Sequence, residues 1–282
     1  MSFKSGFVTI IGNPNVGKSS LFNKLLDFNL SVVTEKSQTT RDSIKGIITT
    51  DKYQIILSDT PGHVESSYLL HDKMNKNIYS SLEGSDLILY VTDTKEKKIN
   101  QKLLDAVHHL EIPVVFIVNK KDLNKNFDLK LIEGEFLDKY LISTKNKDDV
   151  KNILDIIIKS LPVHQAYYSK DELTDKNERF IVSEIVRGEI FKIFSQEIPY
   201  STHVEINTFK NEENLLRIEG YIFTESESQK TIIIGKKGKK IRDLSKNSRL
   251  KIEKLYDKQV YINFTIKVLK WRNDKKFIQS KF

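Results

Sequence analysis

Gly12-Asn13-Pro14-Asn15-Val16-Gly17-Lys18-Ser19 fits the phosphate-loop pattern, in which a glycine and four further residues precede Gly-Lys-Ser. Apolar residues 7–11 before it predict a buried strand, and residues 20–26 after it predict a helix. A strand, this loop and a helix in direct succession predict an α/β domain that binds a nucleoside triphosphate together with Mg²⁺. A glycine-rich turn that matches the pattern by chance would not account for the strand and the helix.

The residue types in this loop suit a polyphosphate ligand. Glycines allow the backbone to curl so that successive N–H groups point inward, and the N-terminus of the following helix adds partial positive charge. We expect Lys18 to reach the β- and γ-phosphates and the Ser19 hydroxyl to ligate Mg²⁺. The residues of this stretch expected to contact the nucleotide are Asn13, Asn15, Val16, Gly17, Lys18, Ser19 and Ser20.

Length and composition exclude several classes of protein. At 282 residues, 39% of them apolar, the chain can form one large or two ordinary domains with real cores. It contains no Cys, which excludes disulfides, thiolate metal sites and a cysteine nucleophile, and which is consistent with an intracellular protein. We expect no signal peptide before the first strand, and no apolar run approaches the roughly 18 residues that cross a bilayer.

The net charge of +8 is concentrated near the C-terminus. Residues 210–282 hold 19 Lys and Arg against 9 Asp and Glu, a net charge of +10, whereas residues 1–209 hold 27 against 29, a net charge of −2. This distribution indicates a polyanionic partner for the C-terminal part, either nucleic acid or an acidic membrane. The alternative is a lysine-rich composition that decorates every surface, which the slightly acidic first part does not favour.

Residues 1–165 read as one domain in which short apolar strands alternate with helices. The predicted strands are residues 7–11, 44–49, 53–58, 87–92, 114–118 and 140–142, with helices between them such as residues 100–110 and 150–160. Alternation of this kind predicts a mostly parallel sheet covered on both faces. Ligands of such folds lie at the carboxyl ends of the strands.

A second domain is predicted at residues 178–282, after a polar linker at residues 166–177. Apolar residues at helical spacing predict a helix over residues 180–194, and residues 239–256 form a basic helical stretch. Residues 202–209, 215–224 and 259–269 predict strands. Residues 231–234 are all β-branched and could form a strand by propensity.

Asp59-Thr60-Pro61-Gly62 follows the predicted strand at residues 53–58 directly. An Asp at this place can hold Mg²⁺ through a water molecule. The Gly62 N–H can contact the γ-phosphate and so report whether that phosphate is present. The pattern Asp-x-x-Gly is common, but its place at a strand end after a phosphate loop indicates a nucleotide-sensing segment.

Asn119-Lys120-Lys121-Asp122, after the strand at residues 114–118, indicates guanine as the base. The Asp122 carboxylate can accept hydrogen bonds from both N1–H and the 2-amino group of guanine, which adenine cannot donate. We expect Asn119 and Lys120 to contact the nucleotide as well. Ser143-Thr144-Lys145 follows the last predicted strand, where a backbone N–H can meet guanine O6.

Gln38-Thr39-Thr40-Arg41-Asp42 lies between the phosphate loop and Asp59. A threonine in this loop can close over Mg²⁺ and the γ-phosphate, which would order the segment with GTP and release it after hydrolysis. Either Thr39 or Thr40 could do so, and the alternative is an ordinary polar loop.

Gly235-Lys236-Lys237-Gly238 fits the Gly-x-x-Gly loop of KH RNA-binding modules. The glycines allow close approach to about four nucleotides, and the lysines supply charge. A KH module requires residues 231–234 to be helical. The alternatives are a basic hairpin or a membrane-surface patch. The predicted RNA-binding residues are Gly235, Lys236, Lys237, Gly238, Lys239, Lys240 and Arg242.

The four nucleotide motifs followed by Gly-Lys-Lys-Gly in a basic module resemble the Era family of bacterial GTPases over essentially the whole chain. The resemblance implies a Ras-like P-loop GTPase domain of α/β class joined to an α+β KH domain of type II. It implies slow hydrolysis of GTP, binding to 16S ribosomal RNA near its 3′ end, and assistance to assembly of the 30S ribosomal subunit. It also implies a cytoplasmic protein partly at the inner face of the cell membrane, and we expect a monomer.

The resemblance also assigns metal ligands. It favours Thr40 over Thr39 as an Mg²⁺ ligand, beside Ser19 and, through water, Asp59. Asn15 resembles the residue that binds K⁺ in a cation-dependent subset of these GTPases, which makes K⁺ a candidate second cation.

His63 departs from the family pattern, which usually has a hydrophobic residue after Asp-x-Pro-Gly. Translation-factor GTPases place a catalytic His there, so our hypothesis is that His63 contributes modestly to hydrolysis, beside Lys18, Thr40 and Gly62. The alternative is a loop histidine that faces solvent. Ser143-Thr144 stands where the family usually has Ser-Ala. Because the expected contact with guanine is made by a backbone N–H, the Thr144 side chain should be tolerated.

Two other functions fit parts of the sequence. The basic C-terminal domain of a GTPase could serve mainly as a membrane or protein adaptor, although such a domain does not need the glycine pair at 235 and 238. A GTP-dependent metabolic enzyme is less favoured, because the sequence shows no second-substrate site of paired carboxylates or clustered His.

Overall fold

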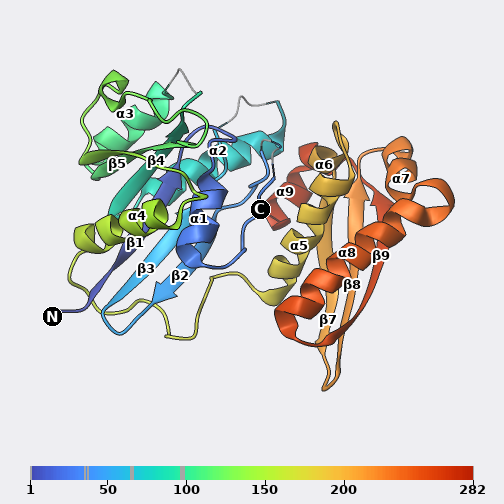
Figure 1. The fold of residues 1–282 in the computed structure, drawn as a ribbon. Coiled ribbons are helices and arrows are strands. Elements are labelled where there is room, and N and C mark those ends of the chain that lie inside the picture. Colours follow the sequence, from blue (N-terminus) through green and yellow to red (C-terminus); the bar gives the residue numbers. More distant parts are fainter. Residues whose placement is uncertain (1, 35, 37, 64–66, 96–98, 282) are drawn as a thin grey trace. The chain divides into compact units, whose positions relative to one another are not determined.

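The computed structural model describes residues 2–34, 36, 38–63, 67–95 and 99–281 (Figure 1). The chain divides into two units: unit 1 lies within residues 1–66 and 71–175, and unit 2 comprises residues 176–282 together with 67–70. None of the helices in the described ranges is long and apolar enough to span a membrane.

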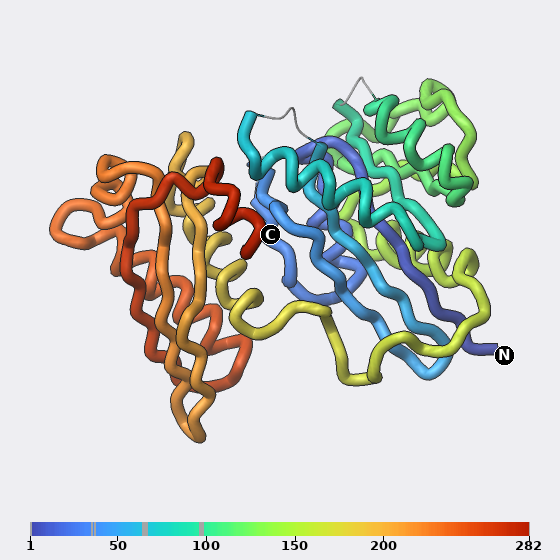
Figure 2. Tube along the Cα trace, turned by 180° about the vertical axis from the view of Figure 1, so that it is seen from behind, coloured from blue at the N-terminus to red at the C-terminus, as the bar shows by residue number. Residues whose placement is uncertain are grey.

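Unit 1 is a six-stranded sheet with the strand order β2-β3-β1-β4-β5-β6. Neighbouring strands are parallel except β2 and β3, which confirms the predicted mostly parallel sheet. Helices α2 and α3 pack on one face, and α1 and α4 lie on the other (Figures 1 and 2). The elements are β1 (Lys4–Ile11), α1 (Lys18–Leu26), β2 (Ile44–Thr49), β3 (Tyr53–Asp59), α2 (Leu69–Leu82), β4 (Leu87–Asp93), α3 (Gln101–His109), β5 (Val114–Asn119), the short 3₁₀ helix η1 (Leu129–Leu131), β6 (Asp138–Leu141) and α4 (Lys147–Ser160).

The central strands of unit 1 show why this sheet forms. Every residue of β4 and β5 is buried, and both strands are continuous apolar runs up to their polar carboxyl-terminal residues, as is typical of strands covered on two faces. Parallel strands β1, β3, β5 and β6 all end at one edge of the sheet. The four nucleotide motifs of the sequence follow these strand ends, so the fold gathers them at one edge.

Residues 167–174, within the expected linker, are bonded to the sheet of unit 1. The side chain of Gln54 is fully buried in β3, and its Oε1 accepts hydrogen bonds from the backbone N–H groups of Tyr167 (2.7 Å) and Tyr168 (3.0 Å). Its Nε2 donates to the carbonyl of Tyr168 (2.8 Å), and Thr174 Oγ1 donates to the carbonyl of Lys45 in β2 (2.6 Å). A buried amide with both ends satisfied therefore ties this segment to the sheet.

Unit 2 is a three-stranded sheet of order β7-β8-β9 with α5 and α8 packed on one face (Figure 1). Strands β7 and β8 are antiparallel, whereas β8 and β9 are parallel. This arrangement confirms the predicted α+β domain. The elements are α5 (Glu178–Ile193), α6 (Ile198–Ser201), β7 (His203–Asn211), β8 (Leu215–Thr224), α7 (Glu227–Ile234), η2 (Lys236–Gly238), α8 (Lys239–Tyr256), β9 (Gln259–Val268), η3 (Trp271–Asn273) and α9 (Lys275–Lys281).

Residues 231–234 are helical, as a KH module requires, and the strand that their β-branching would favour does not form. Ser226 caps α7 by accepting a hydrogen bond from the N–H of Gln229 (3.3 Å). Ile233 is fully buried in the core of unit 2, and Gly235 ends the helix with φ of 70°. The cap at Ser226, the burial of Ile233 and the helix-ending Gly235 together outweigh the strand propensity of residues 231–234.

Candidate functional site

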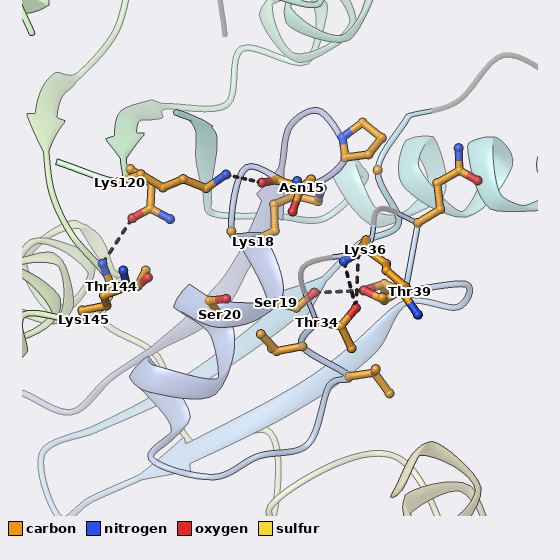
Figure 3. Close-up of a pocket in the computed structure, with 18 of the residues that line it drawn as sticks. Asn15, Lys18, Ser19, Ser20, Thr34, Lys36, Thr39, Lys120, Thr144 and Lys145 are labelled. Carbon is orange, nitrogen blue, oxygen red and sulfur yellow. Dashed lines mark hydrogen bonds between the residues drawn. The ribbon is translucent and has the colours of Figure 1, made fainter. Parts of the chain in front are cut away.

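A cavity of about 670 Å³ lies at the carboxyl edge of the sheet in unit 1 (Figure 3). It is bounded by the loops that follow β1, β3, β5 and β6 and by part of the segment between α1 and β2. Predicted site residues that line it are Asn15, Gly17, Lys18, Ser19, Ser20, Thr40, Gly62, Asn119, Lys120, Asp122, Thr144 and Lys145. Lining residues that the sequence does not single out include Val32, Val33, Thr34, Lys36 and Lys95.

The buried side chain of Asn119 holds the loops of this cavity together. Its Nδ2 donates to the carbonyl of Val16 in the phosphate loop (3.0 Å), and its Oδ1 accepts from the N–H of Thr144 (3.2 Å). Gly17 has φ of 100°, and a Cβ there would lie 2.2 Å from Asn119 Nδ2. Position 17 therefore requires glycine both for its backbone conformation and for this close approach.

Lys18 is buried at the start of α1, and its Nζ donates to the carbonyl of Asn13 (2.8 Å). Burial lowers the pKa of Lys18 to about 8, an effect that the nearby Asp59 carboxylate opposes. A phosphate beside this ammonium would favour its charged form. The loop thus places a poorly solvated cation where an anionic ligand gains most from it.

Ser19, Thr40 and Asp59 meet the requirements of an Mg²⁺ site. The hydroxyls of Ser19 and Thr40 are 2.9 Å apart, which matches adjacent corners of an octahedron with metal–oxygen bonds of about 2.0–2.1 Å. The Asp59 side chain is fully buried, and its Oδ1 has no hydrogen-bond partner among the described residues. A buried carboxylate oxygen without a partner fits a water molecule held by the ion.

The other oxygen of Asp59 is held by hydroxyl groups, one of which the sequence does not reveal. Oδ2 accepts from Ser31 Oγ (2.7 Å) and from Thr40 Oγ1 (3.3 Å). Burial raises the pKa of Asp59, and hydrogen bonds from Ser19, Ser31 and Thr40 together with the Lys18 charge oppose this. No local pattern marks Ser31, because its contact with Asp59 spans 28 residues.

Ser31 is itself fixed by Asn23 of α1. The N–H of Ser31 donates to Asn23 Oδ1 (3.0 Å), and Asn23 Nδ2 donates to the carbonyl of Ser31 (2.8 Å). Both side chains are buried. The segment that leads to Thr40 therefore starts from a fixed point beside the metal site.

Asp122 lies at the far end of the cavity and is already oriented. Its Oδ1 accepts from Ser143 Oγ (2.7 Å), and its Oδ2 pairs with Lys145 Nζ (2.6 Å). The hydrogen bond from Lys145, followed by that from Ser143, lowers the pKa of Asp122. An ionised carboxylate is the acceptor that the two N–H donors of guanine require, and each of its oxygens can accept a second bond.

Lys120 connects the base-recognition motif to the phosphate loop (Figure 3). Its Nζ donates to the carbonyl of Asn15 (2.6 Å) and pairs with Asp93 Oδ2 (2.5 Å) at the end of β4. Asp93 is a further residue that the sequence motifs do not identify. Its carboxylate fixes the ammonium that reaches the phosphate loop.

Gly62 and His63 lie in the segment after β3. A Cβ at position 62 would lie 2.8 Å from Pro14, so glycine allows this segment to approach the phosphate loop. Thr60 Oγ1 donates to the carbonyl of Ile10 (2.7 Å) and anchors the start of the segment. His63 is half-buried and does not line the cavity. Burial, with the charge of Lys102, lowers the pKa of His63, which favours the neutral imidazole at neutral pH.

In unit 2 the Gly-Lys-Lys-Gly motif forms a tight loop between α7 and α8. Gly235, Lys237 and Gly238 all have positive φ, and the N–H of Gly238 donates to the carbonyl of Gly235 (3.0 Å). Lys236 and Lys237 are exposed. Arg242 Nη2 donates to the carbonyl of Lys237 (2.8 Å) and supports the loop. The loop thus presents backbone and two ammonium groups at the start of α8.

A groove of about 490 Å³ runs between α8 and β9, which is an edge strand. Of the residues proposed from the sequence, Arg242 lines this groove, whereas the Lys240 ammonium lies 5.3 Å from the ring centroid of Phe194 at the end of α5. The backbone edge of β9 offers hydrogen-bonding groups there. The groove is lined by Ile241, Arg242, Ser245, Lys246, Arg249, Val260, Tyr261, Ile262, Asn263 and Phe264.

Comparisons with known proteins agree with both units. Residues 7–120 match a family described as 50S ribosome-binding GTPase, and residues 197–272 match the KH domain. The chain is 39% identical to GTPase Era of Clostridium kluyveri, covering 98% of both chains, and 34% identical to GTPase Era of Neisseria meningitidis, covering 99% of this chain and 94% of that one. A crystal structure of Era in complex with MgGDPNP and nucleotides 1506–1542 of 16S ribosomal RNA matches with a TM-score of 0.92 at 32% identity, covering 98% of each chain.

Replacement of Ser31 by Ala should weaken Mg²⁺ binding, because Asp59 then loses the donor that orients its carboxylate. Loss of such an outer partner typically lowers metal affinity by about tenfold or more. The measurement is the release rate of a fluorescent GDP analogue as a function of Mg²⁺ concentration. In EDTA the variant should release GDP at the rate of the unchanged chain.

Ser31→Thr keeps a hydroxyl and is the matched control, which should restore the Mg²⁺ dependence. The prediction is contradicted if the Mg²⁺ concentration that gives the half-maximal effect on GDP release is the same for Ser31→Ala and the unchanged chain. Ser31 would then have no part in holding Asp59.

Proposed function

Because the chain belongs to the Era family of GTPases, we propose that it is a GTP-controlled switch that binds the 3′ region of 16S ribosomal RNA through unit 2. The observation that carries this proposal is a guanine-nucleotide cavity with paired hydroxyls beside Asp59, on the same chain as a Gly-x-x-Gly loop and a basic groove. The proposal includes assistance to assembly of the 30S subunit by a monomeric protein.

Different residues of unit 1 have different roles in the binding and hydrolysis of GTP. Lys18 neutralises charge on the β- and γ-phosphates, and Asp122 selects the base. Ser19, Thr40 and, through water, Asp59 would hold Mg²⁺, which when bound would supply further charge neutralisation at these phosphates. Positioning and electrostatics dominate phosphoryl transfer, and unassisted switch GTPases are slow.

Thr40 and Gly62 link the nucleotide state to conformation. Thr40 can hold its segment against the ion only while the γ-phosphate site is organised, and the Gly62 N–H is placed to sense the same phosphate. Hydrolysis removes these contacts and releases both segments. Such a two-state element can bias RNA binding by unit 2 only if RNA favours one of the two states.

The test uses Lys236→Glu with Lys237→Glu in the full-length protein. RNA affinity should fall by more than tenfold, since two phosphate contacts become repulsive, while GDP affinity stays unchanged. Binding to nucleotides 1506–1542 of 16S ribosomal RNA is measured by fluorescence anisotropy with GDP and with a non-hydrolysable GTP analogue, at several salt concentrations. We expect tighter binding with the GTP analogue and a steep loss of affinity with salt.

The matched control is Lys151→Glu with Lys159→Glu, which makes the same charge change at exposed positions of α4. Equal RNA affinity with GTP analogue, GDP and no nucleotide would contradict the switch. The membrane-adaptor alternative gains support if the unchanged chain floats with anionic vesicles and the Lys236, Lys237 variant does not. Our proposal for location is the cytoplasm, with a fraction at the inner face of the membrane.

His63→Ala should slow single-turnover GTP hydrolysis several-fold without changing GDP affinity. Neutral imidazole is the form that can accept a proton or a hydrogen bond from water, and the pKa of His63 is lowered. The His63-dependent part of the rate should therefore be constant above about pH 6.5, the ordinary His value, and fall below the lowered pKa. An unchanged rate in His63→Ala would assign this side chain to the surface alone.

K⁺ is proposed as a second cation next to Asn15. Single-turnover hydrolysis should be faster in KCl than in NaCl of the same ionic strength, because a bound cation adds positive charge beside the transferring phosphate. Asn15→Ala should remove this difference while leaving GDP affinity largely intact. Equal rates in the two salts for the unchanged chain would exclude K⁺ from the mechanism.

A further inference from the structure

The sheet of unit 2 has one face that its packed helices leave open. Side chains at alternate positions of β8 and β9, such as Ile218 and Ile262, point into the core beneath α5 and α8. The intervening residues point the other way, and Figure 2 shows this opposite face, where α9 lies at one end of the strands. We call it the open face and define it by Arg217, Tyr221, Tyr261, Asn263, Thr265 and Lys267.

Two aromatic rings on the open face each form a cation–π pair with a basic side chain. Arg217 and Tyr261 are direct partners in the β8–β9 register, and the guanidinium carbon lies 4.9 Å from the ring centroid. Lys267 Nζ lies 3.4 Å from the ring centroid of Tyr221. Tyr261 is 44% exposed. Rings and cations thus alternate along the surface, with the polar side chains of Asn263 and Thr265 between them.

Two carboxylates lie close to these ring–cation pairs. Glu205 pairs with Lys281 of α9 (2.7 Å), and Glu219 lies 3.9 Å from Arg217. Lys267 therefore offers a phosphate a cation that forms no ion pair among the described residues, whereas Arg217 faces Glu219 as well as the ring of Tyr261. Single-stranded nucleic acid is bound by this combination of aromatic faces for bases and cations for phosphates.

The open face is continuous with the groove between α8 and β9. Tyr261 lines that groove and also forms the ring–guanidinium pair with Arg217. An RNA strand that leaves the groove can therefore pass over the edge strand β9 at Tyr261 and continue onto the open face.

We infer that the open face is a second contact surface for single-stranded RNA, which extends the site of the groove by stacking bases on Tyr261 and Tyr221. This inference rests on the proposed RNA-binding function of unit 2. An RNA duplex fits less well, because its bases are stacked on one another and cannot reach the rings. A protein partner fits less well, because the core of a protein interface is depleted of charged residues.

The experiment compares two unstructured RNAs of alternating A and C, one of about five nucleotides, close to what a KH groove holds, and one of about 16 nucleotides. Tyr221→Thr with Tyr261→Thr keeps strand-forming residues but removes both rings. Loss of two stacked bases should weaken binding of the long RNA about thirtyfold or more, whereas the short RNA can lose only the contact with Tyr261 in the groove and should weaken clearly less. Ultraviolet crosslinking of the long RNA to the unchanged chain should label peptides that contain Tyr221 or Tyr261.

Tyr79→Thr with Tyr167→Thr is the matched control, since it removes two exposed rings from unit 1. Circular dichroism and thermal unfolding report whether each variant is folded, and Arg217→Gln with Lys267→Gln is a second test that leaves both rings in place. That pair should also weaken binding of the long RNA more than binding of the short RNA.

The inference is overturned if the folded Tyr221, Tyr261 variant binds the long RNA as tightly as the unchanged chain and crosslinks avoid the open face. The two ring–cation pairs then only stabilise the sheet. A failure of the proposed function would give a different result: Lys236→Glu with Lys237→Glu would then leave the affinity for both RNAs unchanged.

Discussion

The buried amide of Asn119 is the interaction on which the nucleotide site depends. Parallel strands bring their loops to one edge of the sheet, but this alone does not set the distances between loops. Asn119 does so by donating to Val16 and accepting from Thr144, which locks the phosphate loop to the loop after β6. Both bonds are made inside the protein, where an unsatisfied amide would be costly. The base end and the phosphate end are therefore built as one rigid frame.

Ser31 and Thr40, which both contact Asp59, are held against this frame in different ways. Ser31 is fixed by Asn23, whereas the hydroxyl of Thr40 contacts Ser19 and Asp59. Oδ1 of Asp59 has no hydrogen-bond partner in the part of the chain that the structure describes, which suits the proposed role of this buried carboxylate beside an ion. Because Thr40 contacts two residues that we propose to hold Mg²⁺, whereas Ser31 is bonded to Asn23 of α1, we expect Thr40 to respond to the nucleotide state more than Ser31 does.

Much of this organisation could be predicted from the sequence, because it depends on short motifs of neighbouring residues. Each nucleotide motif follows a predicted strand, so a parallel sheet was enough to bring Lys18, Asp59 and Asp122 to one edge. Ser31 and Asp93 could not be found this way, because their roles come from partners 28 and 27 residues away. Residues 231–234 were ambiguous for a related reason: β-branching favoured a strand, and only the cap at Ser226 and the burial of Ile233 decide for a helix.

Strand β9 of unit 2 contributes to two different surfaces, the groove and the open face. Strand β9 pairs with β8 on one side only, so its free edge borders the groove, while its alternate side chains belong to the core and to the open face. Side chains at Ile262 and Phe264 pack against the core, whereas Tyr261 and Lys267 lie on the open face, each in a ring–cation pair. A substitution on the open face can therefore change binding without touching the packed face. This separation follows from the two-residue repeat of a strand, and it makes the two contributions of β9 experimentally distinguishable.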